Sequence, residues 1–261
     1  MAGFTPTRST TYPQYEERPP SSLQHLYQFQ KKVGAGAYGD VYIATSRKNG
    51  KTVAIKHIKQ QYNRWEDCLK LRECRALSKL PAHKNCVKLF QLIHEQHELF
   101  FVFEYCPMDL HQLTMKRREQ NVPFTNKEVL TMIYELLSAL QHLHRHGFFH
   151  RDIKPENLLV TENHVIKVAD FGQSREIRNR PPFTDYVSTR WYRAPEVLDG
   201  LGQYNSPVDI WAAGCVLGEL MTCGQPIFPG ELKMLKMLKM LKMLKMLKML
   251  KMLKMLKMFQ S

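Results

Sequence analysis

The amino-acid sequence predicts an α+β fold in which a β-rich half precedes a larger helical half. Short apolar or β-branched runs lie between residues 27 and 103, and a glycine-rich turn follows the first of them. Apolar residues at helical spacing follow Thr125 up to Gly147, and a second helix is predicted over Pro207–Met221. Strands and helices therefore occupy separate parts of the chain, which is typical of an α+β fold.

The β-rich half contains several segments with strand-like patterning. We predict strands at 27–30, 41–44, 52–58, 87–93 and 99–103. Residues Trp65–Leu80 are predicted to form a single helix, because apolar residues recur there at helical spacing. These apolar residues are Leu69, Ala76, Leu77 and Leu80.

The helical half carries local start and stop signals. Thr125 and Glu128 have the spacing of a capping box, in which each side chain satisfies a backbone N–H at the helix start. Gly147 supplies the stop for this helix, since glycine readily adopts the backbone conformation found just beyond a helix end. A second buried helix is predicted over Pro207–Met221.

The two ends of the chain have biased compositions. Residues 1–26 are rich in Thr, Ser, Pro and Tyr, and we expect a disordered arm before a folded region at 27–230. Residues 231–261 form a tail built on a Lys-Met-Leu repeat. A three-residue step rotates by about 300° around a helix, so the lysines would not form one membrane-binding face. We interpret the repeat as a repeat expansion or an error in gene prediction, with a basic binding tail as the alternative.

Charge and cysteine usage exclude several classes. The formal net charge is +14, but nine lysines of the repeat contribute to it and the rest of the chain carries +5, which argues against a nucleic-acid-binding domain. The six cysteines form no C-x-x-C pair, which gives no support to a zinc ribbon or a thioredoxin site. With neither a secretory h-region nor a long apolar stretch in view, we expect an intracellular protein without a membrane span.

A glycine-rich segment lies between two predicted strands and suggests a phosphate site. Glycines let backbone N–H groups approach phosphate oxygens closely. This segment leads into a strand, whereas the glycine fingerprint of a dinucleotide-binding fold opens a helix. The candidate contact residues here are Val33, Gly34, Ala35, Gly36, Ala37, Tyr38, Gly39 and Val41.

Lys56 lies inside the apolar run Thr52–Ile58. Burying a lysine is costly unless a negative group neutralises it. A nucleotide phosphate or the carboxylate of Glu73, in the predicted helix, would serve as that group. A lysine on a solvent-facing strand edge is an equally good interpretation of this segment taken alone.

A second polar cluster contains the residue types that phosphoryl transfer requires. Such transfer depends on positioning and charge neutralisation. Asp152 suits the role of accepting a proton from a hydroxyl group, and Lys154 that of stabilising the moving phosphoryl group. Asn157 and Asp170 offer the oxygen ligands that Mg²⁺ prefers.

Taken together, these segments resemble the signature set of protein kinases. The matching segments, in order, are Gly34–Val41, Val53–Lys56, His150–Asn157, Asp170–Gly172 and Ala194–Glu196. Lys154 resembles the Ser/Thr branch, and the segment Thr184–Glu196 resembles the male-germ-cell-associated and intestinal-cell kinases of the MAP-kinase-like and cyclin-dependent-kinase-like group. The resemblance covers residues 27–230 and implies a bilobal protein-kinase fold, with an N-lobe at 27–106 and a partial C-lobe at 107–230.

The resemblance also implies roles for single residues. It implies ATP and Mg²⁺ as cofactors, with Ala54, Lys56, Phe103, Glu104 and Cys106 on the nucleotide side. Thr184 and Tyr186 match the pair that is phosphorylated by an upstream kinase. The arginines matching the phosphothreonine pocket are Arg72, Arg151 and Arg175, and those matching the phosphotyrosine contacts are Arg190 and Arg193. Asp209 matches a helix aspartate that braces the catalytic loop.

The implied function is phosphorylation of Ser or Thr in protein substrates, with a preference for a following proline. The implied location is the cytoplasm, with cilium, flagellum or nucleus as alternatives. A non-catalytic kinase-like scaffold and a basic nucleic-acid-binding protein are the rival functions, and the folded region is too modestly charged to favour the latter.

Two departures from the family pattern carry expectations of their own. Gln173 replaces the leucine expected after Asp170–Gly172, and a polar group there would loosen the active arrangement or shift the preference between Ser and Thr. The family continues past Gly230 with helices that cover Pro207–Met221 and supply an arginine for Glu196. We therefore expect a C-lobe truncated after its central helix, with an uncovered apolar face.

The histidines of one short segment raise the question of a metal site. They are His142, His144, His146 and His150. The zinc-protease pattern requires glutamate directly after the first histidine, where Leu143 stands. We therefore interpret these histidines as structural or surface residues.

Overall fold

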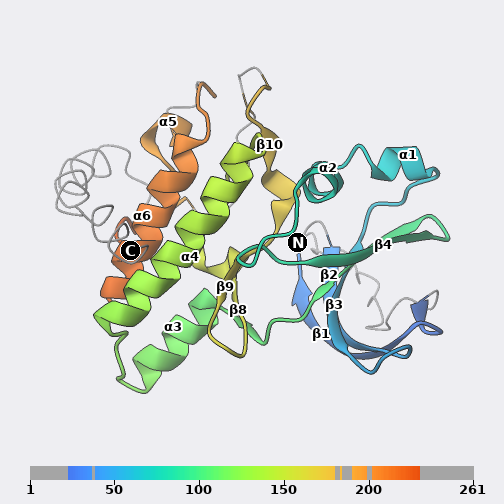
Figure 1. The fold of residues 1–261 in the computed structure, drawn as a ribbon, viewed down its shortest axis with the longest axis horizontal. Helices are drawn as coiled ribbons and strands as arrows, with labels where there is room; N and C mark the ends of the chain where they lie inside the picture. Colours follow the sequence, from blue (N-terminus) through green and yellow to red (C-terminus); the bar gives the residue numbers. More distant parts are fainter. Residues whose placement is uncertain (1–22, 37–38, 180–182, 184–189, 199–201, 230–261) are drawn as a thin grey trace, which may run out of the picture.

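The computed structural model describes residues 23–36, 39–179, 183, 190–198 and 202–229. A five-stranded antiparallel sheet forms one half and helices form most of the other, so the predicted two-lobed α+β arrangement is confirmed (Figure 1). The order of strands in the sheet is β1-β2-β3-β5-β4. Their bounds are β1 Tyr27–Ala35, β2 Gly39–Ser46, β3 Thr52–Ile58, β4 Leu89–Glu95 and β5 Glu98–Glu104.

The first half also contains two helices where the sequence predicted one. Helix α1 covers Trp65–Cys68 and α2 covers Arg72–Lys79, with Leu71 between them. Cys68 and Cys74 are both buried in the main core. Six residues along an unbroken helix rotate by about 600°, so two side chains at that spacing point about 120° apart around the axis. The single-helix prediction is wrong, because the chain leaves the helical conformation at Leu71, whose φ is −58° and whose ψ is 139°.

The expected boundary of the N-terminal arm also needs correction. Leu23 is completely buried and packs with Tyr27 in a small core on the sheet. The Arg47 backbone N–H donates to the Leu26 carbonyl, and the Arg47 side chain donates to the Gln24 carbonyl. Residues from Leu23 onward are therefore part of the folded region, because one apolar side chain and these backbone contacts attach them to β2.

The second half is built around two long helices, α4 (Asn126–Arg145) and α6 (Pro207–Met221), which pack side by side (Figure 1). Thr125 and Glu128 form the predicted capping box, and Gly147 follows α4 with a φ of +82°. The remaining helices are α3 (Leu110–Glu119) and α5 (Pro195–Leu198). Within the parts of the chain that the structure describes, no helix is long and apolar enough to cross a membrane.

Short strands and single turns connect the long helices and carry the polar clusters. Strands β6, β8 and β9 form one small sheet, while β7 pairs with β10. Their bounds are β6 Met108–Asp109, β7 Phe148–Phe149, β8 Leu158–Val160, β9 Ile166–Val168 and β10 Arg175–Glu176. Two 3₁₀ turns, η2 (Pro155–Asn157) and η3 (Phe171–Gln173), lie beside them.

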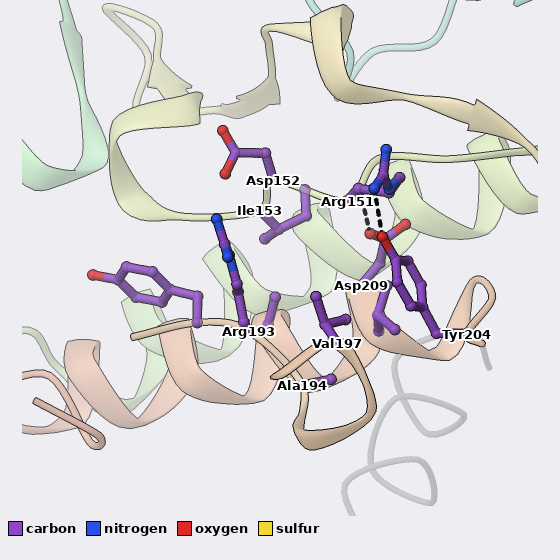
Figure 2. A pocket seen from close by; sticks show the side chains of 11 residues that line it. Arg151, Asp152, Ile153, Arg193, Ala194, Val197, Tyr204 and Asp209 are labelled. Atoms are coloured by element: carbon purple, nitrogen blue, oxygen red, sulfur yellow. Dashed lines mark hydrogen bonds between the residues drawn. The ribbon is translucent and has the colours of Figure 1, made fainter. Parts of the chain in front are cut away.

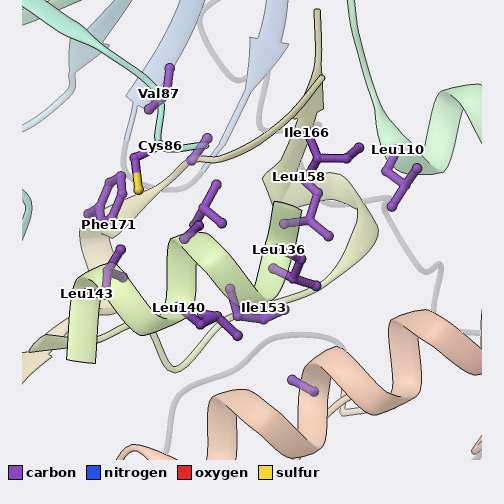
Figure 3. Close-up of a cluster of buried hydrophobic side chains, with 14 of the residues drawn as sticks. Cys86, Val87, Leu110, Leu136, Leu140, Leu143, Ile153, Leu158, Ile166 and Phe171 are labelled. Carbon is purple, nitrogen blue, oxygen red and sulfur yellow. The ribbon is translucent and has the colours of Figure 1, made fainter. Parts of the chain in front are cut away.

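The main core lies under these turns. Leu136, Leu140 and Leu143 of α4 pack in one cluster with Ile153 and Phe171, and all five are buried (Figure 3). Since Ile153 and Phe171 belong to the two polar segments, this core holds both segments against the same helix. Apolar packing therefore sets the distance between residues near 152 and residues near 170.

Most of α6 is covered, contrary to expectation. Its face toward α4 is buried, and Phe228 stacks on Trp211 with ring centroids 5.6 Å apart. Ile227 also lies so close to Gly218 that a Cβ there would meet its side chain. The large exposed face expected for this helix is thus wrong for the described residues, because the segment after the helix returns over it. Ile210 and Met221 stay exposed.

Candidate active site

The glycine-rich turn joins β1 to β2 at the edge of the five-stranded sheet. Gly34 pairs with Val41 across the hairpin, and the Gly36 N–H donates to the Gly39 carbonyl over 2.9 Å. Val33 is exposed. Ala37 and Tyr38, also predicted to contact a nucleotide, lie outside the described residues.

Gly39 is required by close packing against β3. A Cβ at this position would lie 2.4 Å from the backbone oxygen of His57, whereas a Cβ at Gly36 would meet nothing closer than 3.5 Å. Backbone atoms cannot move aside as a flexible side chain can. The last glycine of the turn therefore serves the approach of β2 to β3.

We expect Gly39→Ala to destabilise the protein by about 1–3 kcal/mol, because it introduces a clash with backbone. Gly36→Ala, the matched control, should change stability by less than about 1 kcal/mol. Urea unfolding of both variants measures the difference. Equal losses in the two variants would contradict the proposed role of the β2–β3 approach.

Lys56 on β3 is bound by two carboxylates. Its Nζ lies 2.8 Å and 3.0 Å from the two oxygens of Glu73 on α2, and 3.1 Å from Asp170 Oδ1. The proposed Lys56–Glu73 contact is therefore confirmed, and the alternative of a solvent-facing lysine is wrong. A lysine, a helix carboxylate and the Asp170 carboxylate meet at one point between the two halves.

The two carboxylates of this cluster stabilise the positive charge of Lys56. Burial disfavours the charged form of Lys56, but Glu73 and Asp170 outweigh that effect and raise the pKa of the lysine. Burial likewise opposes the charge on Asp170, yet Lys56 holds the pKa of this carboxyl below its usual value. Asp170 has a left-handed φ of +60° and a side chain that is 46% exposed. The carboxylate is therefore ionised and open to solvent on one side.

The residues predicted on the nucleotide side lie where β3 and β5 meet. Ala54 pairs directly with Phe103. The Glu104 carboxylate accepts from the Lys88 backbone N–H over 2.6 Å and pairs with Lys167 over 3.0 Å. The sequence analysis missed Lys167, which nothing in its local pattern singled out. Half-buried Cys106 follows, and burial raises the pKa of its thiol to about 11.

Asp152 lies in the loop before η2, held by two neighbours. Lys154 Nζ is 3.0 Å from Asp152 Oδ2, and Asn157 Nδ2 donates to the same oxygen over 3.0 Å and to the Asp152 carbonyl over 2.7 Å. The Asn157 carbonyl in turn accepts from the Ala169 N–H, next to Asp170. All four polar residues predicted for phosphoryl transfer are thus brought into one region.

Asp209 of α6 holds the start of this loop, at His150 and Arg151. Its carboxylate is buried in α6 and accepts from the backbone N–H groups of His150 and Arg151 over 2.7 and 2.8 Å. This confirms the bracing contact implied by the family resemblance. His144 of α4 makes a third contact with Asp209 over 2.8 Å, which the sequence analysis did not find.

The four clustered histidines have structural partners. His142 contacts the Pro81 carbonyl, His144 contacts Asp209, His146 contacts the His142 carbonyl and His150 contacts the Ala169 carbonyl. Their nitrogens thus bond to protein groups on several different elements. Among the described residues, no group of three or more potential metal ligands occurs.

The arginines predicted for a phosphothreonine pocket come together. Arg72 and Arg151 both contact Gln173, two residues before Arg175. Burial, and then the positive charges of Arg72 and Arg151, lower the pKa of Arg175. Arg151 donates to the Gln173 carbonyl and to the Tyr204 hydroxyl, and its guanidinium lies over the ring of Phe183. Thr184 and Tyr186 lie outside the described residues.

A pocket opens between the Asp152 loop and α6. Arg193 and Asp152 line it together with Arg151, Tyr204 and Val197 (Figure 2). Arg193 is buried, whereas Arg190 is exposed. Gln173 belongs to η3, and its Oε1 lies 3.5 Å from Arg72 Nη1 on α2. Its polar side chain therefore has a partner on α2.

Comparison with known proteins agrees with this geometry. The chain is 49% identical over 200 residues to the mouse serine/threonine-protein kinase ICK, covering 77% of this chain and 31% of that protein. It is 47% identical over 204 residues to mouse MAK, covering 78% and 32%, and 51% identical over 205 residues to a probable serine/threonine-protein kinase of Dictyostelium discoideum, covering 78% and 39%. The chain thus spans about a third of the length of these curated relatives.

The family match covers most of the chain. Residues 27–260 match the family described as protein kinase domain. The two-lobed fold, the paired Lys56 and Glu73, and the Asp152 loop braced by Asp209 agree with that assignment. This chain therefore belongs to the protein kinase family.

Proposed function

We propose that this protein transfers the terminal phosphoryl group of ATP to Ser or Thr hydroxyls of protein substrates. The observation that carries the proposal is the arrangement of Asp152, which is bonded to Lys154 and Asn157. A carboxylate held in this way is suited to orient an acceptor hydroxyl and to accept its proton. Lys154 is placed to stabilise the charge that develops on the transferred group.

The nucleotide end of the site has a complementary set of charges. Lys56, kept cationic by Glu73 and Asp170, would contact the phosphates, and the β1–β2 turn would cover them. Mg²⁺, when bound, would neutralise phosphate charge. Asp170 offers an exposed carboxylate for it. In the described structure, the side chain of Asn157 donates two hydrogen bonds through its amide nitrogen, and its oxygen can serve as a second ligand.

We further propose that the enzyme prefers Ser or Thr followed by proline and is activated when an upstream kinase phosphorylates Thr184 and Tyr186. The grouping of Arg72, Arg151 and Arg175 near Gln173 supports the activation step of this proposal, because a phosphate carries about −1.5 to −2 charges and binds arginine clusters.

The test uses the full chain purified from eukaryotic cells and two peptides that differ only in having Pro or Ala after the target Ser. We expect ATP-dependent phosphorylation with at least tenfold higher kcat/KM for the Ser-Pro peptide. Phosphatase treatment should lower this activity in the wild type and leave a Thr184→Ala/Tyr186→Phe variant unchanged. Equal use of both peptides would refute the proline preference, and an ATP-binding protein without transfer would refute the activity.

A further inference from the structure

Lys59, directly after β3, contacts the backbone of the glycine-rich turn. Its Nζ donates to the Gly36 carbonyl over 2.8 Å. The N–H of the same glycine donates to the Gly39 carbonyl over 2.9 Å. Both polar backbone groups of Gly36 are therefore bonded in the described structure, one within the turn and one to a side chain from the neighbouring strand end.

Asp40 holds Lys59 in this position. Asp40 Oδ1 lies 3.4 Å from Lys59 Nζ, and Oδ2 lies 3.1 Å from Lys32 Nζ. Asp40 is also the register partner of His57 on β3, so its carboxylate stands beside the strand from which Lys59 emerges. Burial opposes ionisation of Asp40, but the neighbouring Lys32 and Lys59 lower its pKa.

We propose that Lys59 is a positioning residue that braces the glycine-rich turn for ATP, with Asp40 as its anchor. The proposal rests on the nucleotide site proposed above and adds residues that this site did not include. Glycines lose more conformational freedom on ordering than other residues. A Gly36 whose backbone is already bonded before ATP binds loses less freedom on binding, and the affinity rises accordingly.

A simpler effect of Lys59 would be direct attraction of the phosphates by its positive charge. The two effects predict opposite changes in ATP affinity when Asp40 is replaced by Asn. Asp40→Asn removes a negative charge near the phosphates, so direct attraction predicts tighter ATP binding. The brace predicts weaker binding, because Lys59 loses its anchor.

The experiment is an equilibrium titration of the full chain with ATP and, separately, with adenosine. Lys59→Met and Asp40→Asn should each weaken ATP binding about three- to fivefold, the size expected for a half-exposed charged contact. Adenosine affinity should not change, because adenosine has no phosphates under the turn. Lys59→Arg, which keeps a positively charged hydrogen-bond donor at this position, should bind ATP nearly as tightly as the wild type.

Lys51→Met is the matched control, because it removes the same positive charge from an exposed lysine at the other end of β3. It should leave the ATP affinity within error of the wild type. In steady-state assays, Lys59→Met should raise KM for ATP with little change in kcat, and thermal unfolding should be unaltered.

Tighter ATP binding in Asp40→Asn, or equal losses in Lys51→Met and Lys59→Met, would overturn the brace. Unchanged binding in Lys59→Met would overturn it as well. A wild type that binds ATP but transfers no phosphate counts only against the proposed activity, because the titration measures the brace without any transfer.

Discussion

Asp152→Asn should lower the rate of phosphoryl transfer by about 10²- to 10⁴-fold, the usual range for loss of a general base. Asparagine has nearly the same shape and can still accept a hydrogen bond from Lys154, whose Nζ lies 3.0 Å from the carboxylate. It cannot accept the proton of the attacking hydroxyl. The effect should therefore fall on kcat.

The measurement is single-turnover phosphorylation beside an ATP titration of the same variant. ATP affinity should stay within about twofold of the wild type, because the groups proposed to hold the phosphates, Lys56 and the glycine-rich turn, are positioned by Glu73 and Lys59. Asp67→Asn, an exposed aspartate of α1, provides the same chemical change far from the site and should retain full activity. Retained kcat in Asp152→Asn would refute the role of this carboxylate.

Asp209→Asn should destabilise the protein by about 2–4 kcal/mol, the cost of disrupting a buried charged hydrogen-bonding group. The carboxylate accepts two backbone N–H groups and contacts His144, all within 2.8 Å. An amide has only one accepting oxygen, so its NH₂ group would face one of these donors. The loop that carries Asp152 would therefore lose one of the two backbone hydrogen bonds that His150 and Arg151 donate to Asp209.

Urea unfolding of Asp209→Asn and of the Asp67→Asn control measures this loss. The control should change stability by less than about 0.5 kcal/mol, since Asp67 forms only an exposed pair with Lys70. His144→Asn, which removes one contact and leaves both backbone bonds, should cost less than Asp209→Asn. An Asp209 variant as stable as the control would show that the loop is held by its apolar packing alone.

Two helices were predictable from the sequence because their signals are local. The capping box at Thr125 and Glu128 and the glycine at 147 limit α4, and the apolar run Pro207–Met221 coincides with α6. Each signal acts within a few residues along the chain. The pairing of Lys56 with Glu73 could also be predicted from the sequence, because a lysine in a buried strand requires a negative partner and the predicted helix contains few carboxylates.

Contacts between distant segments were decided by the tertiary structure. The chain breaks between α1 and α2 although apolar residues continue at helical spacing, and Leu23 joins the folded region because the sheet offers it a buried place. Spacing along the chain contains no information about such contacts. The same is true of Lys167 beside Glu104.

The sequence by itself determined the two-lobed α+β class, the residue types of the site and their order along the chain, because these follow from local patterning and from the chemistry of each side chain. Only the tertiary structure decided that Lys59 reaches the Gly36 carbonyl and that His144 completes the contacts of Asp209. Both contacts join residues that no local pattern connects. The first contact depends on how β3 packs in the sheet and the second on how α4 packs against α6, and such packing is a property of the whole core.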